Sequence, residues 1–455
     1  METRVLFIGL GLHARRIQYP YIMRRRKELG VTEVVTLDLL EQKEIVQSYL
    51  SRMPEDVKAH KYYTDKYIDT DLLDKIVDTH SITHVILGTD PEHHFKYARY
   101  ALERSLRVMM DKPIVAIPHS IEDPNAAQLI LDQFLELKDV YDKYPDSSLT
   151  VLCQRRYHPA YAKIVSDVVE NYNRTKVIPH YLYLMHSDGQ LRVLNEIDDI
   201  SYHGFNTGYG KMSHSGYHFI DTLYCYLKYF IEKGEIDNFS LMAHHLSPLD
   251  YSMQIGPDSV KSILGTDGEV TPYNATAKGE IDMYVTMQFK KGDRLITTAR
   301  LDMLHSGFSD RINFCANQKD LYKGNGRIRH EKQIILQGPI YAAYIDSLQS
   351  KQINLKEEDS QTSLGGEHHF DLIRFNHTSN GKKIATRDSI DDIMDITNLG
   401  YSRGHQEEAR YYSLDDFFSS HRSKVSDLTD HHFSSLIMSS IYLAASTNKT
   451  ISKEI

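Results

Sequence analysis

The 455-residue sequence has no tryptophan, only three cysteines and no long apolar run. Cys153, Cys225 and Cys315 lie far apart, without the spacing of a metal site, so we expect reduced thiols in a cytoplasmic protein. No stretch of about 18 apolar residues could span a membrane. Two glycines interrupt the first apolar stretch and no small-residue cleavage site follows it, which argues against a signal peptide.

Positive charge is also scarce. The chain has 53 Lys and Arg against 62 Asp and Glu, a net charge of −9, and this argues against a nucleic-acid partner. The basic run at residues 24–27 is an exception that we interpret as the solvated face of a helix. A chain of this length buries a large core, and we expect two or three domains.

Strand and helix patterns alternate through the first 150 residues. "RVLFIG" (residues 4–9) and "EVVTLDLL" (33–40) are short apolar runs typical of strands buried on both faces. We expect the helix between them to bend at Pro20 and to close at Gly30. Further helix and strand patterns occupy residues 71–89, 91–105 and 107–114. This βαβ spacing predicts an α/β fold with a doubly wound parallel sheet.

The turn after the first strand carries a phosphate-binding pattern. Gly9, Gly11 and Ala14 fit G-x-G-x-x-G/A, between a strand and a helix. Gly9 permits a tight turn, Gly11 permits close approach of a pyrophosphate, and Ala14 permits close packing of helix and strand. The helix N-terminus then offers free N–H groups to the phosphate. The alternative is a plain structural turn.

The end of the second strand bears on the choice of dinucleotide. Asp38 could accept hydrogen bonds from an adenosine ribose and would repel a 2′-phosphate, which favours NAD. Arg15 and Arg16 keep NADP open as the alternative.

Four segments in order resemble the glucose–fructose oxidoreductase/inositol dehydrogenase (Gfo/Idh/MocA) family. They are "GLGLHARRI", "TDPEHHFKYARYALERSLRVMMDKPI", "QRRYHPAY" and "GYGKMSHSGYHFID", and "SSLIMSSIYLAASTNKTI" is similar to the last helix of that family. The resemblance spans almost the whole chain. Residues 232–280 and 305–430 match poorly, and we expect expanded loops there.

The resemblance implies cofactor contacts. Thr89, Pro91 and His94 match a segment that lines the nicotinamide side of the cleft in the family. Asp111 and Lys112 match its E-K-P motif, where the acid contacts the cofactor ribose and the lysine reaches both cofactor and substrate hydroxyl. The cofactor contacts that we expect are Gly9, Gly11, Leu12, His13, Ala14, Arg15, Asp38, Thr89, Pro91, His94, Asp111 and Lys112.

The resemblance also implies an acid–base centre. Gly216, His218 and Asp221 match G-x-H-x-x-D, in which the histidine is the catalytic acid/base. His214 stands where the family often carries an aspartate. A histidine, with a reference pKa of about 6.5, can take a hydroxyl proton near neutral pH. We therefore expect Lys112, His218 and His214 to be catalytic.

His214 and His218 have a second interpretation. A spacing of four places both on one face if the segment is helical, and such a pair is also common in zinc sites. No glutamate lies between them and Gly216 weakens a helix, so we predict a catalytic pair and no bound metal.

The second half of the chain predicts a sheet domain. Residues 176–187 form a strand pattern, and residues 280–304 form a hairpin pattern. We assign residues 1–155 to a dinucleotide-binding Rossmann domain. Residues 156–455 are assigned to an α+β domain with a large open, mainly antiparallel sheet, for substrate binding and oligomerisation. The last helix could pack back on the first domain.

We have further expectations for loops, substrate contacts and oligomerisation. Residues 380–426 are polar and predict loops and short helices. By the resemblance, Arg156, Tyr157 and Asp221 contact substrate, and one sheet face forms a homodimer or homotetramer.

These patterns predict a cytoplasmic NAD(P)-dependent oxidoreductase. The resemblance alone implies the substrate, a hydroxyl or ketone on a sugar, cyclitol or sugar-derived molecule. One alternative is an NAD-using epimerase or glycoside-cleaving enzyme with no net redox change. Another is a non-catalytic dinucleotide-binding protein; Lys112 and His218 count against it, and the missing carboxylate at position 214 counts for it.

Overall fold

The computed structural model forms two compact units. The first contains residues 1–116, 130–157 and 406–435, and the second contains residues 117–129, 158–405 and 436–455. The residues that the structure describes are 2–51, 54–189, 207–264, 278–309, 328–350, 369–377, 380–394 and 405–455. Cys315 lies outside them, as do parts of the two regions expected to be expanded loops.

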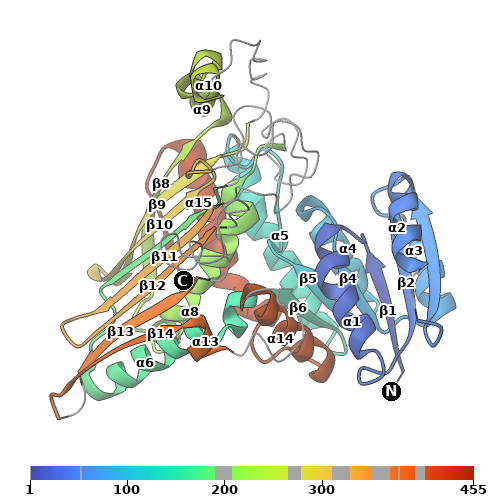
Figure 1. The fold of residues 1–455 in the computed structure, drawn as a ribbon, viewed down its shortest axis with the longest axis horizontal. Helices are drawn as coiled ribbons and strands as arrows, with labels where there is room; N and C mark the ends of the chain where they lie inside the picture. Colours follow the sequence, from blue (N-terminus) through green and yellow to red (C-terminus); the bar gives the residue numbers. More distant parts are fainter. Residues whose placement is uncertain are drawn as a thin grey trace. The chain divides into compact units, whose positions relative to one another are not determined.

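The first unit is built on a six-stranded sheet in the order β3-β2-β1-β4-β5-β6, with every pair of neighbours parallel (Figure 1). This is the order of a doubly wound dinucleotide-binding fold, and it confirms the predicted parallel sheet. The strands are β1 (Thr3–Ile8), β2 (Val31–Leu39), β3 (Lys58–Thr64), β4 (His84–Leu87), β5 (Arg107–Asp111) and β6 (Ser148–Leu152).

A late segment of the chain completes the core of this unit. Tyr411, Leu414 and Phe417 are buried in the same apolar cluster as Val5 and Phe7 of β1. The α-helices that lie wholly or mostly in this unit are α1 (Tyr19–Arg25), α2 (Lys43–Leu50), α3 (Thr70–His80), α4 (His94–Glu103), α5 (Pro124–Lys143) and α14 (His405–Ser419). Short helices are η1 (Ala14–Gln18), η2 (Leu40–Gln42), η3 (Pro91–His93), η4 (Gln154–Tyr157) and η8 (Leu428–His431).

The first helix contains a widened turn just before Pro20. The segment η1 is a π-helical turn, and the N–H of Tyr19 bonds to the carbonyl of Ala14. Proline has no N–H, and its ring clashes with the preceding turn of an α-helix, so a π turn is one way to accommodate it. Helix α1 ends at Arg25, before Gly30, which has a φ of +64° at the entry to β2.

The second unit is built on a nine-stranded sheet in the order β14-β13-β12-β11-β7-β10-β9-β8-β15 (Figure 1). Only β7 and β10 are parallel neighbours, so the predicted mainly antiparallel sheet is confirmed. The strands are β7 (Tyr181–Ser187), β8 (Asn238–Leu246), β9 (Asp282–Lys291), β10 (Arg294–Leu304), β11 (Ile328–Gln337), β12 (Tyr341–Ser350), β13 (Asp371–His377), β14 (Lys383–Ser389) and β15 (Ile451–Glu454).

Two expectations for this region were wrong. Strands β11 to β14 occupy part of residues 305–430, where we expected expanded loops, and β8 lies in 232–280. Helix α14 is 15 residues long, more than the short helices expected there. In β11, polar residues occupy buried positions (Glu331, Gln333 and Gln337) while Ile334 and Leu336 are half-exposed, so the sequence lacks the usual alternation of a half-buried strand. The predicted hairpin, β9 and β10, is confirmed.

Helices α6 and α8 cover one face of the nine-stranded sheet (Figure 1). Strand β9 alternates accordingly, with Met283 and Val285 buried and Tyr284 and Thr286 exposed. The helical elements with residues in this unit are α6 (Pro159–Thr175), η7 (Met212–Gly216), α8 (Tyr217–Glu232), α9 (Pro248–Gln254), α10 (Pro257–Leu264), α13 (Ile390–Ile393) and α15 (His432–Thr447). Among the described residues, none of the helices is long and apolar enough to cross a membrane.

Candidate functional site

The turn after β1 is packed against the end of β4. Gly9 has a φ of +78°, which favours glycine, and a Cβ added to it would lie 3.0 Å from the carbonyl of Gly88. A Cβ on Gly88 would lie 2.5 Å from the carbonyl oxygen of Gly9. The two glycines therefore let the two strand ends approach each other closely.

The rest of the turn leads directly into the helix. A Cβ added to Gly11 would lie 3.0 Å from the carbonyl oxygen of Gly88, and Ala14 is buried. Leu12 and His13 form the first helical residues, so the opening N–H groups of this helix lie at the carboxyl end of β1. The turn therefore has small residues where it packs against the sheet, and its other side presents the N-terminus of a helix.

Asp38, near the end of β2, contacts this turn. Its Oδ2 accepts a hydrogen bond of 2.7 Å from the N–H of Leu10, and its Oδ1 accepts one of 2.8 Å from the N–H of Leu39. Burial raises the pKa of Asp38, while these two hydrogen bonds and the nearby Arg15 guanidinium act in the opposite direction. The carboxyl group is therefore held beside the turn.

Two buried polar atoms near the turn have no hydrogen-bond partner within the described part of the chain. They are the Nε of Arg15 and the Oγ1 of Thr89. The Arg15 guanidinium lies 5.3 Å from the ring centre of Tyr49. A buried polar group without a partner is costly. These atoms, together with the glycine turn, fit a polar ligand such as a dinucleotide.

The end of β5 is tied to the same helix. The Nδ1 of His13 lies 3.1 Å from Oδ2 of Asp111, and the N–H of Lys112 donates to Oδ1 of Asp111 at 2.8 Å. Burial lowers the pKa of Lys112, although Asp111 partly opposes this effect. Burial likewise lowers the pKa of His13. The structure thus brings residues of two separate sequence motifs together at the carboxyl edge of the sheet.

His94 connects two loops at this edge. Its Nδ1 lies 2.8 Å from the carbonyl oxygen of Pro113, and its Nε2 lies 3.1 Å from that of Thr89. Burial lowers the pKa of His94, and a neutral ring donates from one nitrogen only. Both ring nitrogens face main-chain oxygens, so His94 positions these loops. Pro91, another expected contact, begins η3.

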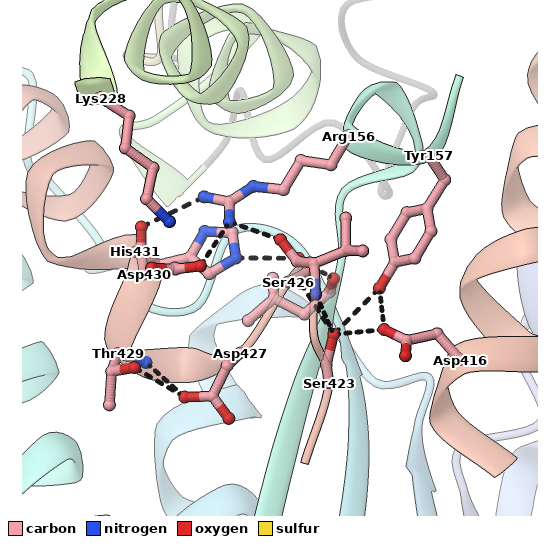
Figure 2. A network of polar contacts seen from close by, with 12 residues as sticks. Arg156, Tyr157, Lys228, Asp416, Ser423, Ser426, Asp427, Thr429, Asp430 and His431 are labelled. Carbon is pink, nitrogen blue, oxygen red and sulfur yellow. Dashed lines mark hydrogen bonds and ion pairs between the residues drawn. The ribbon is translucent and has the colours of Figure 1, made fainter. Parts of the chain in front are cut away.

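Arg156 contacts the segment that follows α14, and Tyr157 contacts α14 itself (Figure 2). The Arg156 guanidinium, with its side chain 3% exposed, donates to the carbonyls of Val425 at 2.9 Å and Asp430 at 3.1 Å. The Tyr157 hydroxyl donates to Asp416 at 2.9 Å. These contacts give both side chains a structural role in the first unit, and their contact with substrate stays a prediction.

In the second unit, His214 and His218 lie on one continuous helix. His214 is in the π turn η7, His218 is in the first turn of α8, and Asp221 is buried in the same helix. The segment is therefore helical, as the pairing of the two histidines requires, despite Gly216. A Cβ on Gly216 would lie 2.5 Å from the Sδ of Met212, so glycine makes room for that side chain.

A buried carboxyl group that the sequence did not reveal supports this turn. Glu280 Oε1 accepts hydrogen bonds of 2.8 Å from the N–H of Met212 and from the hydroxyl of Tyr442. The Tyr442 hydroxyl also lies 2.7 Å from Oγ of Ser213. Burial raises the pKa of Glu280 to about 7. No motif marks Glu280, because its role follows from a contact between distant segments.

A second buried cluster lies at the start of the same helix. The Nζ of Lys211 lies 2.6 Å from Oδ2 of Asp188 and 3.0 Å from Nδ1 of His186. His305 Nδ1 lies 2.8 Å from the same Asp188 oxygen. Burial would raise the pKa of Asp188, but Lys211, His186 and His305 lower it well below its ordinary value. Lys211 lay within a segment that resembles the family and His186 within a predicted strand, and neither was assigned a role.

Residues 3–165 match the family model described as an oxidoreductase family with an NAD-binding Rossmann fold. This match confirms the resemblance to the Gfo/Idh/MocA family over that range. It also confirms the expectation of NAD as cofactor, because the family is described as NAD-binding. No curated protein gives a significant match to the sequence.

Solved structures share the fold along the whole chain. An oxidoreductase from Agrobacterium radiobacter, in complex with NAD+, L-tartaric acid and magnesium, is 13% identical, with a TM-score of 0.59 and coverage of 99% of this chain and 98% of its own. A myo-inositol dehydrogenase from Corynebacterium glutamicum is 12% identical, with a TM-score of 0.55 and 99% coverage of both chains. A levoglucosan dehydrogenase in complex with NADH is 11% identical, with a TM-score of 0.59 and 99% coverage of both.

Proposed function

We propose that this protein is an NAD-dependent dehydrogenase or reductase that acts on a hydroxyl or ketone of a sugar, cyclitol or sugar-derived molecule. The observation that carries the proposal is the arrangement within the first unit. A glycine turn backed by the Asp38 carboxyl lies at the same sheet edge as Lys112, which follows β5. Ligands of doubly wound folds bind at this edge.

The residues of the first unit would bind and orient the dinucleotide. The helix N-terminus after Gly11 would bind the pyrophosphate, and Asp38 would accept hydrogen bonds from ribose hydroxyls. Arg15 Nε and Thr89 Oγ1 would gain the partners that they lack among the described residues. When bound, the cofactor supplies a hydride acceptor or donor at C4 of its nicotinamide ring.

Lys112 and His218 would handle the proton of the reacting hydroxyl. Burial lowers the pKa of Lys112. A lysine with a lowered pKa exchanges a proton with a substrate oxygen more readily than an ordinary lysine does. His218 would take the proton during oxidation, and His214, one turn away, would tune or relay it. Lys112 belongs to the first unit and His218 to the second, so their convergence is part of the proposal.

The substrate class is supported by the similar proteins. Two of the solved structures that share the fold are named for oxidation of a cyclitol or an anhydrosugar, myo-inositol dehydrogenase and levoglucosan dehydrogenase. We include in the proposal a cytoplasmic location and a homodimer or homotetramer formed through a sheet face.

The test is direct. Purified protein is incubated with NAD+ or NADP+ and a panel of polyols, aldoses and cyclitols, and reduction is followed by absorbance at about 340 nm while products are identified by mass spectrometry. We expect NADH to form with at least one member of the panel. Product formation without added or consumed dinucleotide would instead support a reaction with no net redox change. Binding of NAD(H) with no turnover across the panel would support a non-catalytic role.

A further inference from the structure

Two histidines and a glutamate meet at the edge of the six-stranded sheet opposite the glycine turn. Glu33 lies near the start of β2, His60 lies near the start of β3, and His80 is the last residue of α3. Strands β2 and β3 are parallel neighbours, with Glu33 opposite Lys58 and Val35 opposite His60. The amino ends of the two strands therefore bring these side chains to one edge.

The three side chains converge on a single point. Oε1 of Glu33 lies 2.5 Å from Nδ1 of His80 and 3.1 Å from Nε2 of His60. One ligand atom from each residue lies within 4.8 Å of the other two. The two imidazole rings have centres 4.3 Å apart. Two nitrogens and one carboxylate oxygen thus face a common centre.

A fourth side chain contacts the outer ring nitrogen of His80. The Tyr62 hydroxyl lies 2.8 Å from Nε2 of His80. If Nε2 carries the proton and donates it to Tyr62, Nδ1 keeps its lone pair and points at the Glu33 oxygen. Metal-binding histidines commonly use the second ring nitrogen in this way, with an oxygen as its partner.

Without a metal, the same side chains can form a set of hydrogen bonds. With its proton on Nδ1, a neutral His80 can donate to Glu33 at 2.5 Å and accept a hydrogen bond from the Tyr62 hydroxyl at 2.8 Å. Nε2 of His60 can donate to the same Glu33 oxygen at 3.1 Å. A metal would replace these hydrogen bonds: both rings would direct a nitrogen lone pair at it, and Nε2–H of His80 would donate to Tyr62.

We propose that Glu33, His60 and His80 bind a divalent transition-metal ion, with zinc the best match. Zinc takes imidazole nitrogen and carboxylate oxygen ligands at about 2.0–2.2 Å, in sites of three protein ligands plus water. The side chains of His80 and Glu33 are 6% and 13% exposed, whereas that of His60 is 40% exposed, so the open side would admit a water as the fourth ligand.

The ion would join β2, β3 and α3 and would stabilise the fold without taking part in the proposed reaction. Glu33 and Asp38 lie on the same strand, five residues apart, so about 16 Å of extended chain separates this site from the glycine turn. This inference does not rest on the proposed function, and it can hold if that function fails.

The experiment uses tag-free, full-length protein that has been stripped with a chelator and then dialysed. Zn²⁺ binding is measured by calorimetry, and Co²⁺ is used as a visible probe because its absorption reports tetrahedral nitrogen and oxygen ligands. We expect one tight site, and a rise in melting temperature when zinc is added. His60→Gln and Glu33→Gln should each weaken binding by at least about tenfold, and Tyr62→Phe by about 10-fold.

The control is His119→Gln, which removes an exposed histidine whose Nδ1 lies 3.4 Å from Glu122. It should leave binding unchanged. His60→Gln changes a partly exposed side chain, so it should fold normally, and circular dichroism checks this. If the wild type binds no zinc, or if His60→Gln and Glu33→Gln bind it as the wild type does, the cluster is a hydrogen-bonded group only and the proposal is wrong.

Discussion

The carboxyl group of Asp38 accepts a hydrogen bond of 2.7 Å from the backbone N–H of Leu10, and this bond links the end of β2 to the turn between β1 and the first helix. The contact fixes the carboxyl group where the ribose of a dinucleotide is expected. The Arg15 guanidinium is close enough to influence the pKa of Asp38. One acidic and one basic group therefore lie beside the turn, and we propose that their balance decides between NAD and NADP.

Asp38→Ala should weaken NAD binding and reduce the preference for NAD over NADP. The substitution removes acceptors for the ribose hydroxyls, and hydrogen bonds to charged groups contribute about 1.5–3 kcal/mol each, so a loss of roughly 10- to 100-fold in affinity is expected. Titration of both dinucleotides by fluorescence or calorimetry measures it. Asp71→Asn, at an exposed position on α3, is the matched control. If the wild type binds NADP more tightly than NAD, we would instead infer that Arg15 or Arg16 binds the 2′-phosphate.

Gly11→Val should reduce dinucleotide affinity by at least about tenfold. The added side chain meets the carbonyl oxygen of Gly88 and crowds the face where a pyrophosphate would approach. Gly256→Val is the control, since the nearest atom to a Cβ there is 3.8 Å away. Because Gly11 also packs against β4, melting temperature is measured beside affinity. A folded Gly11→Val protein that binds NAD as tightly as the wild type would make the turn purely structural.

The parallel sheet was predictable because its strands are short apolar runs with helices between them. Strand β3, Lys58–Thr64, was missed because it is an edge strand with no residue of its sequence "KAHKYYT" buried except the last. The turn at Gly9 and Gly11 was also predictable, but its packing partner Gly88 was not, since that contact joins β1 to a strand far along the chain.

In the second unit, less of the candidate site could be predicted from the sequence. His214 and His218 were singled out from a motif, and their helix was left open. Glu280 and Tyr442, which support that helix, lie in predicted elements but carry no signal of their own role. Burial raises the pKa of Glu280, and burial is a property of the fold that a single sequence does not encode locally.

Glu280 should make stability fall as pH rises toward neutrality. Its pKa is about 7 in the folded protein, above the ordinary value of 4.5, so the folded state binds more protons between these values. Its stabilising contribution is full below about pH 4.5 and is lost as pH rises through about 7, an effect on the order of 3 kcal/mol. Glu280→Gln cannot ionise and should remove this part of the pH dependence. Urea unfolding midpoints at pH 5 and pH 8 for both proteins measure it, and an identical pH dependence would contradict it.

Lys112→Met and His218→Gln should lower turnover by about 10²- to 10⁴-fold, which is the usual contribution of general acid–base catalysis, while dinucleotide affinity changes little. Steady-state kinetics with the substrate found by the panel separates kcat from KM, and calorimetry gives the affinity for NAD. Lys143→Met and His119→Gln, at exposed positions, are the controls.

His214→Asp restores the residue that the family often carries, so it should keep activity within about tenfold if this position only tunes or relays the proton. Normal turnover in folded His218→Gln would exclude His218 as the base, and the search would then move to His214 and Tyr157.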